Sequence, residues 1–170
     1  NDLDIKESGL FYFDEKKEKN IERFRDRIIF PINNISGKHI AIGGRTLNQT
    51  SYIAKYINSP ETIFYKKGSN LYNLDLARKF SNSSENIYVV EGYMDAIALN
   101  KHNIENVVAN LGTALTNKQI QTLCQFFNHI IICFDGDKSG YSAALRAAEN
   151  LIQELKPDKN ISFLFLPEKE

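Results

Sequence analysis

Two aspartates, Asp135 and Asp137, stand one residue apart directly after an apolar run, in the sequence FDGDKSG. Removing a carboxylate from water is costly, and two carboxylates at neighbouring positions repel each other, so the pair needs a counter-charge. A divalent cation is the usual one, because Mg²⁺ and similar hard cations prefer carboxylate oxygens. The pattern therefore predicts a metal site where a buried strand ends.

Three other interpretations of this motif have to be weighed. A calcium-binding loop begins in the same way, but its twelfth position is Arg146 instead of a bidentate glutamate, so we discount it. An aspartyl-phosphate enzyme would use Asp135 as nucleophile and Asp137 as acid. A purely structural role would have Asp-Gly-Asp form a turn and cap the following helix. From the motif alone, the last two alternatives stay open.

Composition indicates a globular protein with one sizeable core. The chain has 170 residues, of which 42% are hydrophobic, and it is long enough to carry a smaller subdomain beside that core. No apolar run approaches the length of a membrane span, and the polar start has no signal-peptide character. Cys124 and Cys133 lie in apolar stretches without CxxC or histidine partners, which predicts reduced core thiols and an intracellular location.

Charge is unevenly distributed although the net charge is zero. Residues 16–79 contain 13 Lys and Arg against 5 Asp and Glu, and the rest of the chain contains 8 against 16. A basic segment joined to an acidic one is what a track for a phosphate backbone beside a metal site would look like. Ordinary solvated surface charge is the alternative.

The first part of the chain reads as a hairpin followed by a helix. Short apolar runs at 27–32 and 39–43 flank a polar turn and predict two paired strands. A helix is expected over 71–80, and the polar residues 81–84 are expected to form a linker.

The second part alternates short apolar strands with helical patterns. Strands are expected at 87–90, 107–110, 130–134 and 161–166, and helices at 93–102, at 117–127 and between the last two strands. Helical spacing in that last helix puts one apolar face on Ala144, Ala147, Ala148, Leu151, Ile152 and Leu155. Strands joined by helical crossovers predict a parallel sheet that is covered on both faces and binds ligands at the carboxyl ends of its strands.

Further acidic residues are expected at that same edge of the sheet. Glu91 stands just past the first of these strands, so it can converge with Asp135 and Asp137 although it is distant in sequence. Asp95 lies one helical turn beyond Glu91 and can face the same site. Gly92 and Gly136 either let the backbone approach a phosphate or metal closely or serve only turn geometry.

Several motifs resemble the TOPRIM domain of bacterial DnaG-type primases. They are EGYMD at 91–95, NLGTALT at 110–116 and FDGDKSGYSAALRA at 134–147. Upstream, RFRDRIIFPI at 23–32, GGR at 43–45 and KYINSPET at 55–62 are similar to the basic subdomain of the same family. The resemblance runs from about Ser8 to Pro167, and the GGR and NSPET segments favour the primase branch over other TOPRIM proteins.

The resemblance implies an α/β fold: a TOPRIM domain at 83–170 with a mostly parallel sheet flanked by helices, after a partial basic α+β subdomain at 1–82. It implies synthesis of RNA primers with Mg²⁺ or Mn²⁺. The catalytic acids of the family match Glu91, Asp95, Asp135 and Asp137. Of these, the resemblance implies that the metal ligands are Glu91, Asp135 and Asp137. Glu91 is expected to act as general base or to orient the metal. The expected contacts to template or triphosphate oxygens are Arg25, Arg27, Arg45, Lys55 and Lys67.

The partners that the resemblance implies are single-stranded DNA, ribonucleoside triphosphates and, through a region absent here, the replicative helicase of the primosome. The location would be the bacterial cytoplasm at the replication fork. In the family a further acidic cluster follows the last strand, and the chain stops at Glu170 where that cluster would begin, so little primer synthesis is expected from these residues alone. A non-catalytic TOPRIM module that binds nucleic acid and an aspartyl-phosphate phosphatase are the alternative functions.

Overall fold

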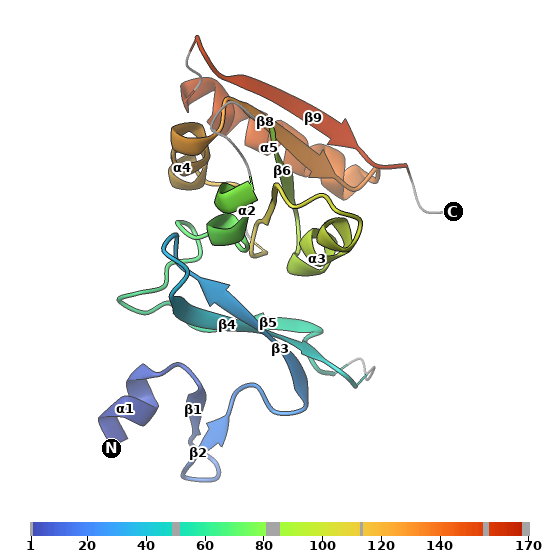
Figure 1. Ribbon diagram of the computed structural model, residues 1–170. Coiled ribbons are helices and arrows are strands. Elements are labelled where there is room, and N and C mark those ends of the chain that lie inside the picture. Colours follow the sequence, from blue (N-terminus) through green and yellow to red (C-terminus); the bar gives the residue numbers. More distant parts are fainter. Residues whose placement is uncertain (1, 49–51, 81–85, 113, 155–156, 168–170) are drawn as a thin grey trace. The chain divides into compact units, whose positions relative to one another are not determined.

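The structure, a computed structural model, describes residues 2–48, 52–80, 86–112, 114–154 and 157–167 (Figure 1). The chain divides into two compact units, Asn1–Asn33 with Lys38–Lys66 and Asn34–Gly37 with Lys67–Glu170. The linker expected at 81–84, and with it the domain boundary expected after residue 82, lies outside the described residues.

The first unit contains two small antiparallel sheets. A helix, α1 (Asp2–Glu7), precedes the hairpin of β1 (Phe11–Asp14) and β2 (Lys19–Glu22). The second sheet has the order β3-β4-β5, with β3 (Arg27–Asn33), β4 (His39–Thr46) and β5 (Tyr56–Asn58). The hairpin expected at 27–43 is confirmed as β3 and β4. The other elements, which have three to six residues each, were missed because such short segments display no clear hydrophobic period.

The second unit is built on a parallel sheet of order β7-β6-β8-β9. Its strands are β6 (Asn86–Val90), β7 (Val107–Ala109), β8 (His129–Phe134) and β9 (Asn160–Phe165). Each strand pairs with its neighbour in parallel register, and a helix connects each strand to the next along the chain (Figure 1). The predicted α/β fold with a parallel sheet is confirmed, and the helices between the strands supply the long crossovers that parallel neighbours need.

Helices cover both faces of this sheet. Alternate strand residues such as Ile87, Val89 and Ile132 form one core cluster with α2 (Leu74–Phe80), α4 (Asn117–Phe126) and α5 (Lys138–Glu154). The intervening residues, such as Val90 and Cys133, pack with α3 (Tyr93–Lys101) on the opposite face. This two-sided burial explains why the strands read as continuous apolar runs.

The apolar face of α5 is narrower than expected. Ala144, Ala147 and Leu151 are buried, whereas Ile152 is 70% exposed and Leu155 lies outside the described residues. An α-helix turns by about 100° per residue. This rotation carries Ile152 away from the line through Leu151 that contacts the sheet.

Two simpler expectations agree with the structure. Cys124 and Cys133 are buried and are not joined in a disulfide, as predicted for core thiols. Among the helices of the described residues, none combines the length and the apolar character that a membrane crossing requires.

Candidate active site

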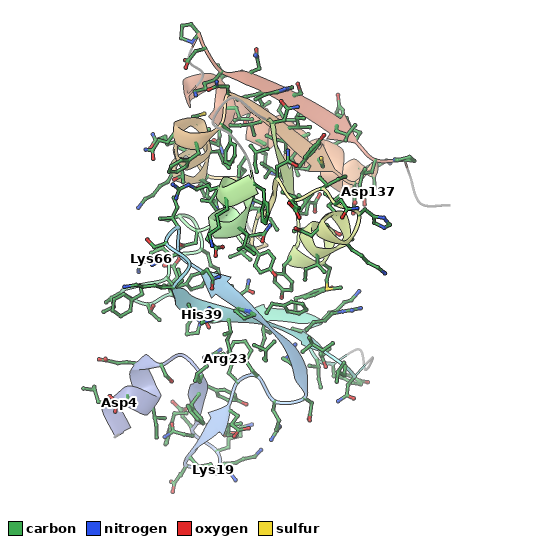
Figure 2. All side chains as sticks on the ribbon, viewed as in Figure 1. Asp4, Lys19, Arg23, His39, Lys66 and Asp137 are labelled. Carbon is green, nitrogen blue, oxygen red and sulfur yellow. The ribbon has the colours of Figure 1, made fainter. Side chains whose placement is uncertain are left out.

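The acidic residues lie where two neighbouring strands of the second unit end. β6 and β8 are hydrogen-bonded in parallel, so their carboxyl ends meet at one edge of the sheet. Glu91 follows β6 directly, and Asp135 and Asp137 follow β8. Asp95 comes from the first turn of α3, which begins two residues after Glu91. Figure 2 labels Asp137 at this edge.

The electrostatics of Glu91 show that these carboxylates are close together. Burial raises the pKa of Glu91, and the negative charges of Asp135, Asp95 and Asp137 raise it further. A hydrogen bond from the backbone N–H of Asp135 to the Glu91 carboxylate opposes this shift without cancelling it. The structure therefore places Glu91 within electrostatic range of the three other acids that the sequence singled out, and each of them repels its carboxylate.

Two of these acids are held by the backbone of the helix that follows each strand. Asp95 Oδ2 accepts a hydrogen bond from the N–H of Gly92 at 3.1 Å. Asp137 Oδ1 accepts one from the N–H of Gly140 at 2.7 Å, and the Asp137 carbonyl accepts one from Tyr141 at 3.0 Å. Asp137 thus caps α5, as the structural interpretation of the motif predicted, and each capping carboxylate keeps a second oxygen that these bonds do not use.

Gly140 brings the start of α5 against the backbone of Asp135. A Cβ atom at position 140 would overlap the Asp135 carbonyl oxygen and would lie 2.9 Å from its carbonyl carbon and 3.1 Å from its nitrogen. Only glycine fits this contact, and sequence reasoning missed it in favour of Gly92 and Gly136. The available signal was a glycine inside the first turn of a helix, where it normally costs about 1 kcal/mol relative to alanine and so indicates a packing reason.

The donor atoms of this site suit a hard divalent cation. All four side chains offer carboxylate oxygens, and a divalent cation would neutralise the negative charge that repels Glu91. Within the described ranges, no three His, Cys, Asp or Glu side chains are already arranged to hold a metal ion between them. The four acids therefore suit a divalent cation by their charge and their oxygen donors, although among the described residues they do not form a preformed metal site.

A pocket of about 340 Å³ is bordered by Glu91. This volume falls in the range of pockets that hold small molecules. Its walls come from the ends of β6 and β8, the loop that follows β7 and one side of α5, and include Val89, Glu91, Asn110, Leu115, Phe134 and Arg146. Sequence reasoning assigned no role to Asn110 or Arg146, although both lie inside the quoted motifs.

The basic residues of the first unit differ in the contacts that their charged groups make. Arg27 Nη1 donates to the carbonyl oxygens of Gly44 at 3.4 Å and Lys55 at 3.3 Å, so its guanidinium partly serves to hold β3 and the Lys55 segment together. Arg45 and Lys55 each lie 5.8 Å from the centre of the Tyr56 ring. Arg25 is exposed in the turn before β3. The structure therefore groups Arg45 and Lys55 around an exposed aromatic ring.

Lys67 belongs to the second unit and has its own surroundings. Its backbone carbonyl accepts a hydrogen bond from the side chain of Gln119 in α4 at 3.0 Å. Its side chain is half-buried. The predicted basic residues are thus distributed over both units.

Ionised Glu91 is expected to destabilise the fold at neutral pH. Its pKa is higher in the folded state, so stability from this group is fully present at low pH and is lost as the pH rises through the folded pKa. Glu91→Gln should therefore raise the free energy of unfolding near pH 7, and this gain should vanish below about pH 4. Denaturant unfolding at both pH values measures it, with Glu105→Gln as an exposed control. An equal gain at both pH values would contradict the assigned cause.

Two family models match the chain. The model for the N-terminal domain of the DNA primase catalytic core matches residues 1–78. The model for the Toprim domain matches residues 85–165, which include all four acids.

Individual relatives agree with these family matches. A DNA primase from Pseudomonas aeruginosa is 45% identical over 164 residues, covering 96% of this chain and 24% of the relative. A DNA primase from Pasteurella multocida is 46% identical over 152 residues, covering 89% of this chain and 26% of the relative. The chain therefore spans about a quarter of the length of these curated relatives.

Solved structures show the same similarity. A DNA primase domain from Pseudomonas aeruginosa matches with a TM-score of 0.91 and 44% identity, covering 98% of this chain and 51% of that one. The Escherichia coli primase catalytic core matches with a TM-score of 0.91 and 38% identity, covering 99% and 53%. A DnaG primase catalytic domain bound to single-stranded DNA matches with a TM-score of 0.91 and 37% identity, covering 100% and 54%.

Proposed function

The chain belongs to the DnaG-type DNA primases, as part of their catalytic core, and from this premise we propose that the full-length protein synthesises short RNA primers on single-stranded DNA. The substrates are ribonucleoside triphosphates, and the reaction is nucleotidyl transfer. We assign residues 1–82 to the basic subdomain and 83–170 to the TOPRIM domain. The observation that carries the proposal is the convergence of Glu91 with Asp95, Asp135 and Asp137 at the carboxyl edge of the parallel sheet.

We assign the binding of Mg²⁺ or Mn²⁺ to Glu91, Asp135 and Asp137. Bound there, a divalent cation would neutralise charge on the reacting phosphate and lower the pKa of the attacking hydroxyl. Asp95 and Asp137 are anchored by backbone N–H groups, which limits how far their carboxylates move when a ligand binds. Loss of any of these acids leaves less negative charge to hold the cation.

Glu91 fits the role of proton acceptor or of a residue that orients the metal. Partial burial and the neighbouring carboxylates raise its pKa, which makes its carboxylate a stronger base than a glutamate without these neighbours. It also borders the 340 Å³ pocket, so a group bound in that pocket would lie beside its carboxylate. The acid is thus placed to act on a ligand and is not confined to a structural contact.

Five basic residues are proposed to bind phosphate oxygens of the DNA template or the nucleotide: Arg25, Arg27, Arg45, Lys55 and Lys67. Guanidinium groups bind phosphate through two parallel hydrogen bonds, whereas lysine acts as a point charge. Tyr56 is exposed, lies 5.8 Å from both Arg45 and Lys55, and offers a ring on which a base can stack. A similar catalytic domain bound to single-stranded DNA supports this assignment.

Arg45→Ala and Lys55→Ala should each weaken single-stranded DNA binding about tenfold at low salt, because each removes a charge beside Tyr56. The wild-type affinity should fall as salt concentration rises, and each variant should show a shallower salt dependence. Fluorescence anisotropy with labelled DNA measures both quantities, and Lys101→Ala at the end of α3 is the control. A salt-independent affinity would mean that the basic segment is ordinary surface charge.

The decisive experiment is de novo primer synthesis by the full-length protein on single-stranded DNA with ribonucleoside triphosphates and Mg²⁺ or Mn²⁺. A TOPRIM module that only binds would retain DNA binding and form no product. An aspartyl-phosphate phosphatase would form a phosphoenzyme on Asp135 and would not need the basic residues. We further propose a cytoplasmic location and contact with the replicative helicase through another part of the protein.

A further inference from the structure

Gln119 is a fully buried polar side chain in α4 whose hydrogen bonds reach beyond its own helix. It has 0% of its surface exposed. Its Nε2 atom donates to the carbonyl oxygen of Lys67 at 3.0 Å and to that of Asn70 at 2.9 Å. A third acceptor, Oδ1 of Asn110, lies at 3.3 Å. An amide nitrogen carries two hydrogens, so the two shorter bonds to the 67–70 segment are the principal ones.

The other end of the same side chain holds the start of α4. Gln119 Oε1 accepts from the N–H of Thr116 at 3.0 Å. Thr116 itself donates from Oγ1 to the carbonyl oxygen of Gly68 at 2.6 Å. The side chains of Thr116 and Gln119 therefore bind three carbonyl groups of the 67–70 segment. Thr116 is also the residue at which the loop that begins at Asn110 meets α4.

Both partners of Gln119 carry residues of the proposed active site. The 67–70 segment contains Lys67, which is assigned to phosphate binding. The loop contains Asn110, which is 8% exposed and borders the pocket together with Glu91. Gln119 therefore contacts both the backbone of the segment that carries Lys67 and the loop that borders the acidic site.

We propose that Gln119 is a positioning residue, which fixes the backbone of Lys67 against the 110–116 loop so that the Lys67 ammonium is held ready to bind phosphate oxygens. The capping box with Thr116 accounts for the amide oxygen of Gln119, but it does not account for the Nε2 donor, which bonds to the carbonyl oxygens of Lys67 and Asn70. An apolar residue would fill the same buried volume, but it would leave the carbonyls of Lys67 and Asn70 without this donor. This inference rests on the proposed role of Lys67.

The first test is independent of any enzyme activity. Gln119→Met keeps the length and volume of the side chain and removes its hydrogen bonds. Hydrogen–deuterium exchange of wild-type and variant full-length protein should show exchange rising about tenfold at 67–70 and 110–116, and much less elsewhere in the second unit. Leu123→Ala, which deletes another fully buried side chain of α4, is the matched control for a general loss of stability.

The second test asks whether Gln119 acts through Lys67. Gln119→Met and Lys67→Ala should each weaken binding about tenfold, and the double variant should be little worse than either alone. Single-stranded DNA and a ribonucleoside triphosphate are titrated separately, which shows which of the two supplies the phosphate oxygens. Leu123→Ala combined with Lys67→Ala should instead show independent effects.

Several results would overturn the proposal. One is hydrogen–deuterium exchange in Gln119→Met that rises evenly over the second unit, as in Leu123→Ala. Another is a double variant whose loss of binding equals the product of the losses caused by Gln119→Met and Lys67→Ala alone. If Gln119→Met does not fold, Thr116→Val removes the third hydrogen bond to the same segment, and Thr116→Ser keeps it. Unchanged exchange at 67–70 in Thr116→Val would then reject the proposal. If the wild-type protein makes no primer, the proposed function fails, and the exchange comparison still decides whether Gln119 positions the segment.

Discussion

Asp135→Ala in the full-length protein should reduce primer synthesis by about two to four orders of magnitude while the protein stays folded. Asp135 lies at the end of β8, and its charge is one of those that raise the pKa of Glu91. Removing it takes away a proposed metal ligand and the negative charge that would hold the cation. Because Glu91 then loses one of the charges that repel it, the fold should not be weakened. Glu91→Gln should have a similar effect on synthesis.

The measurement is the initial rate of primer synthesis over a range of Mg²⁺ or Mn²⁺ concentrations, with circular dichroism to verify folding. Asp158→Asn and Glu105→Gln are matched controls, since both are exposed acids of the second unit outside the site. They should retain nearly the wild-type rate. Wild-type rates for Asp135→Ala or Glu91→Gln would reject the assignment of these carboxylates to a metal site.

Gly140→Ala should destabilise the protein by about 3 kcal/mol, the size of a severe overpacking. This is the opposite of the usual effect, since alanine in place of glycine inside a helix normally stabilises it by about 1 kcal/mol. The added Cβ would overlap the carbonyl oxygen of Asp135, and backbone atoms on both sides would have to move. Asp135 would move with them, and a displacement of about 1 Å at a catalytic group can lower the rate about a hundredfold.

Denaturant unfolding measures the first effect, and primer synthesis at a temperature where the variant stays folded measures the second. Ala144→Gly in the same helix is a useful control, because it lowers helix propensity and adds no overlap. A Gly140→Ala protein as stable and as active as wild type would show that the start of α5 adjusts freely.

The sequence by itself determined the fold of the second unit and the candidate acids. Strands such as 130–134 are long enough and apolar enough to be recognised, and helices between them favour parallel pairing. Parallel pairing in turn places the residue after each strand at one edge, which is why Glu91 and Asp135 could be expected to meet. The order of the motifs along the chain indicated the family, because several short motifs in a fixed order are far more specific than a pair of aspartates.

Tertiary structure alone decided how these residues are held. The overlap that requires glycine at position 140 depends on the backbone path of Asp135, and the raised pKa of Glu91 depends on burial and on distances between side chains. Gln119 shows the same limit, because its partners at 67 and 70 lie about fifty residues away and nothing in the local pattern around 119 points to them. Local periodicity reports which face of an element is buried, but a hydrogen bond between distant segments is set by the packing of the whole unit.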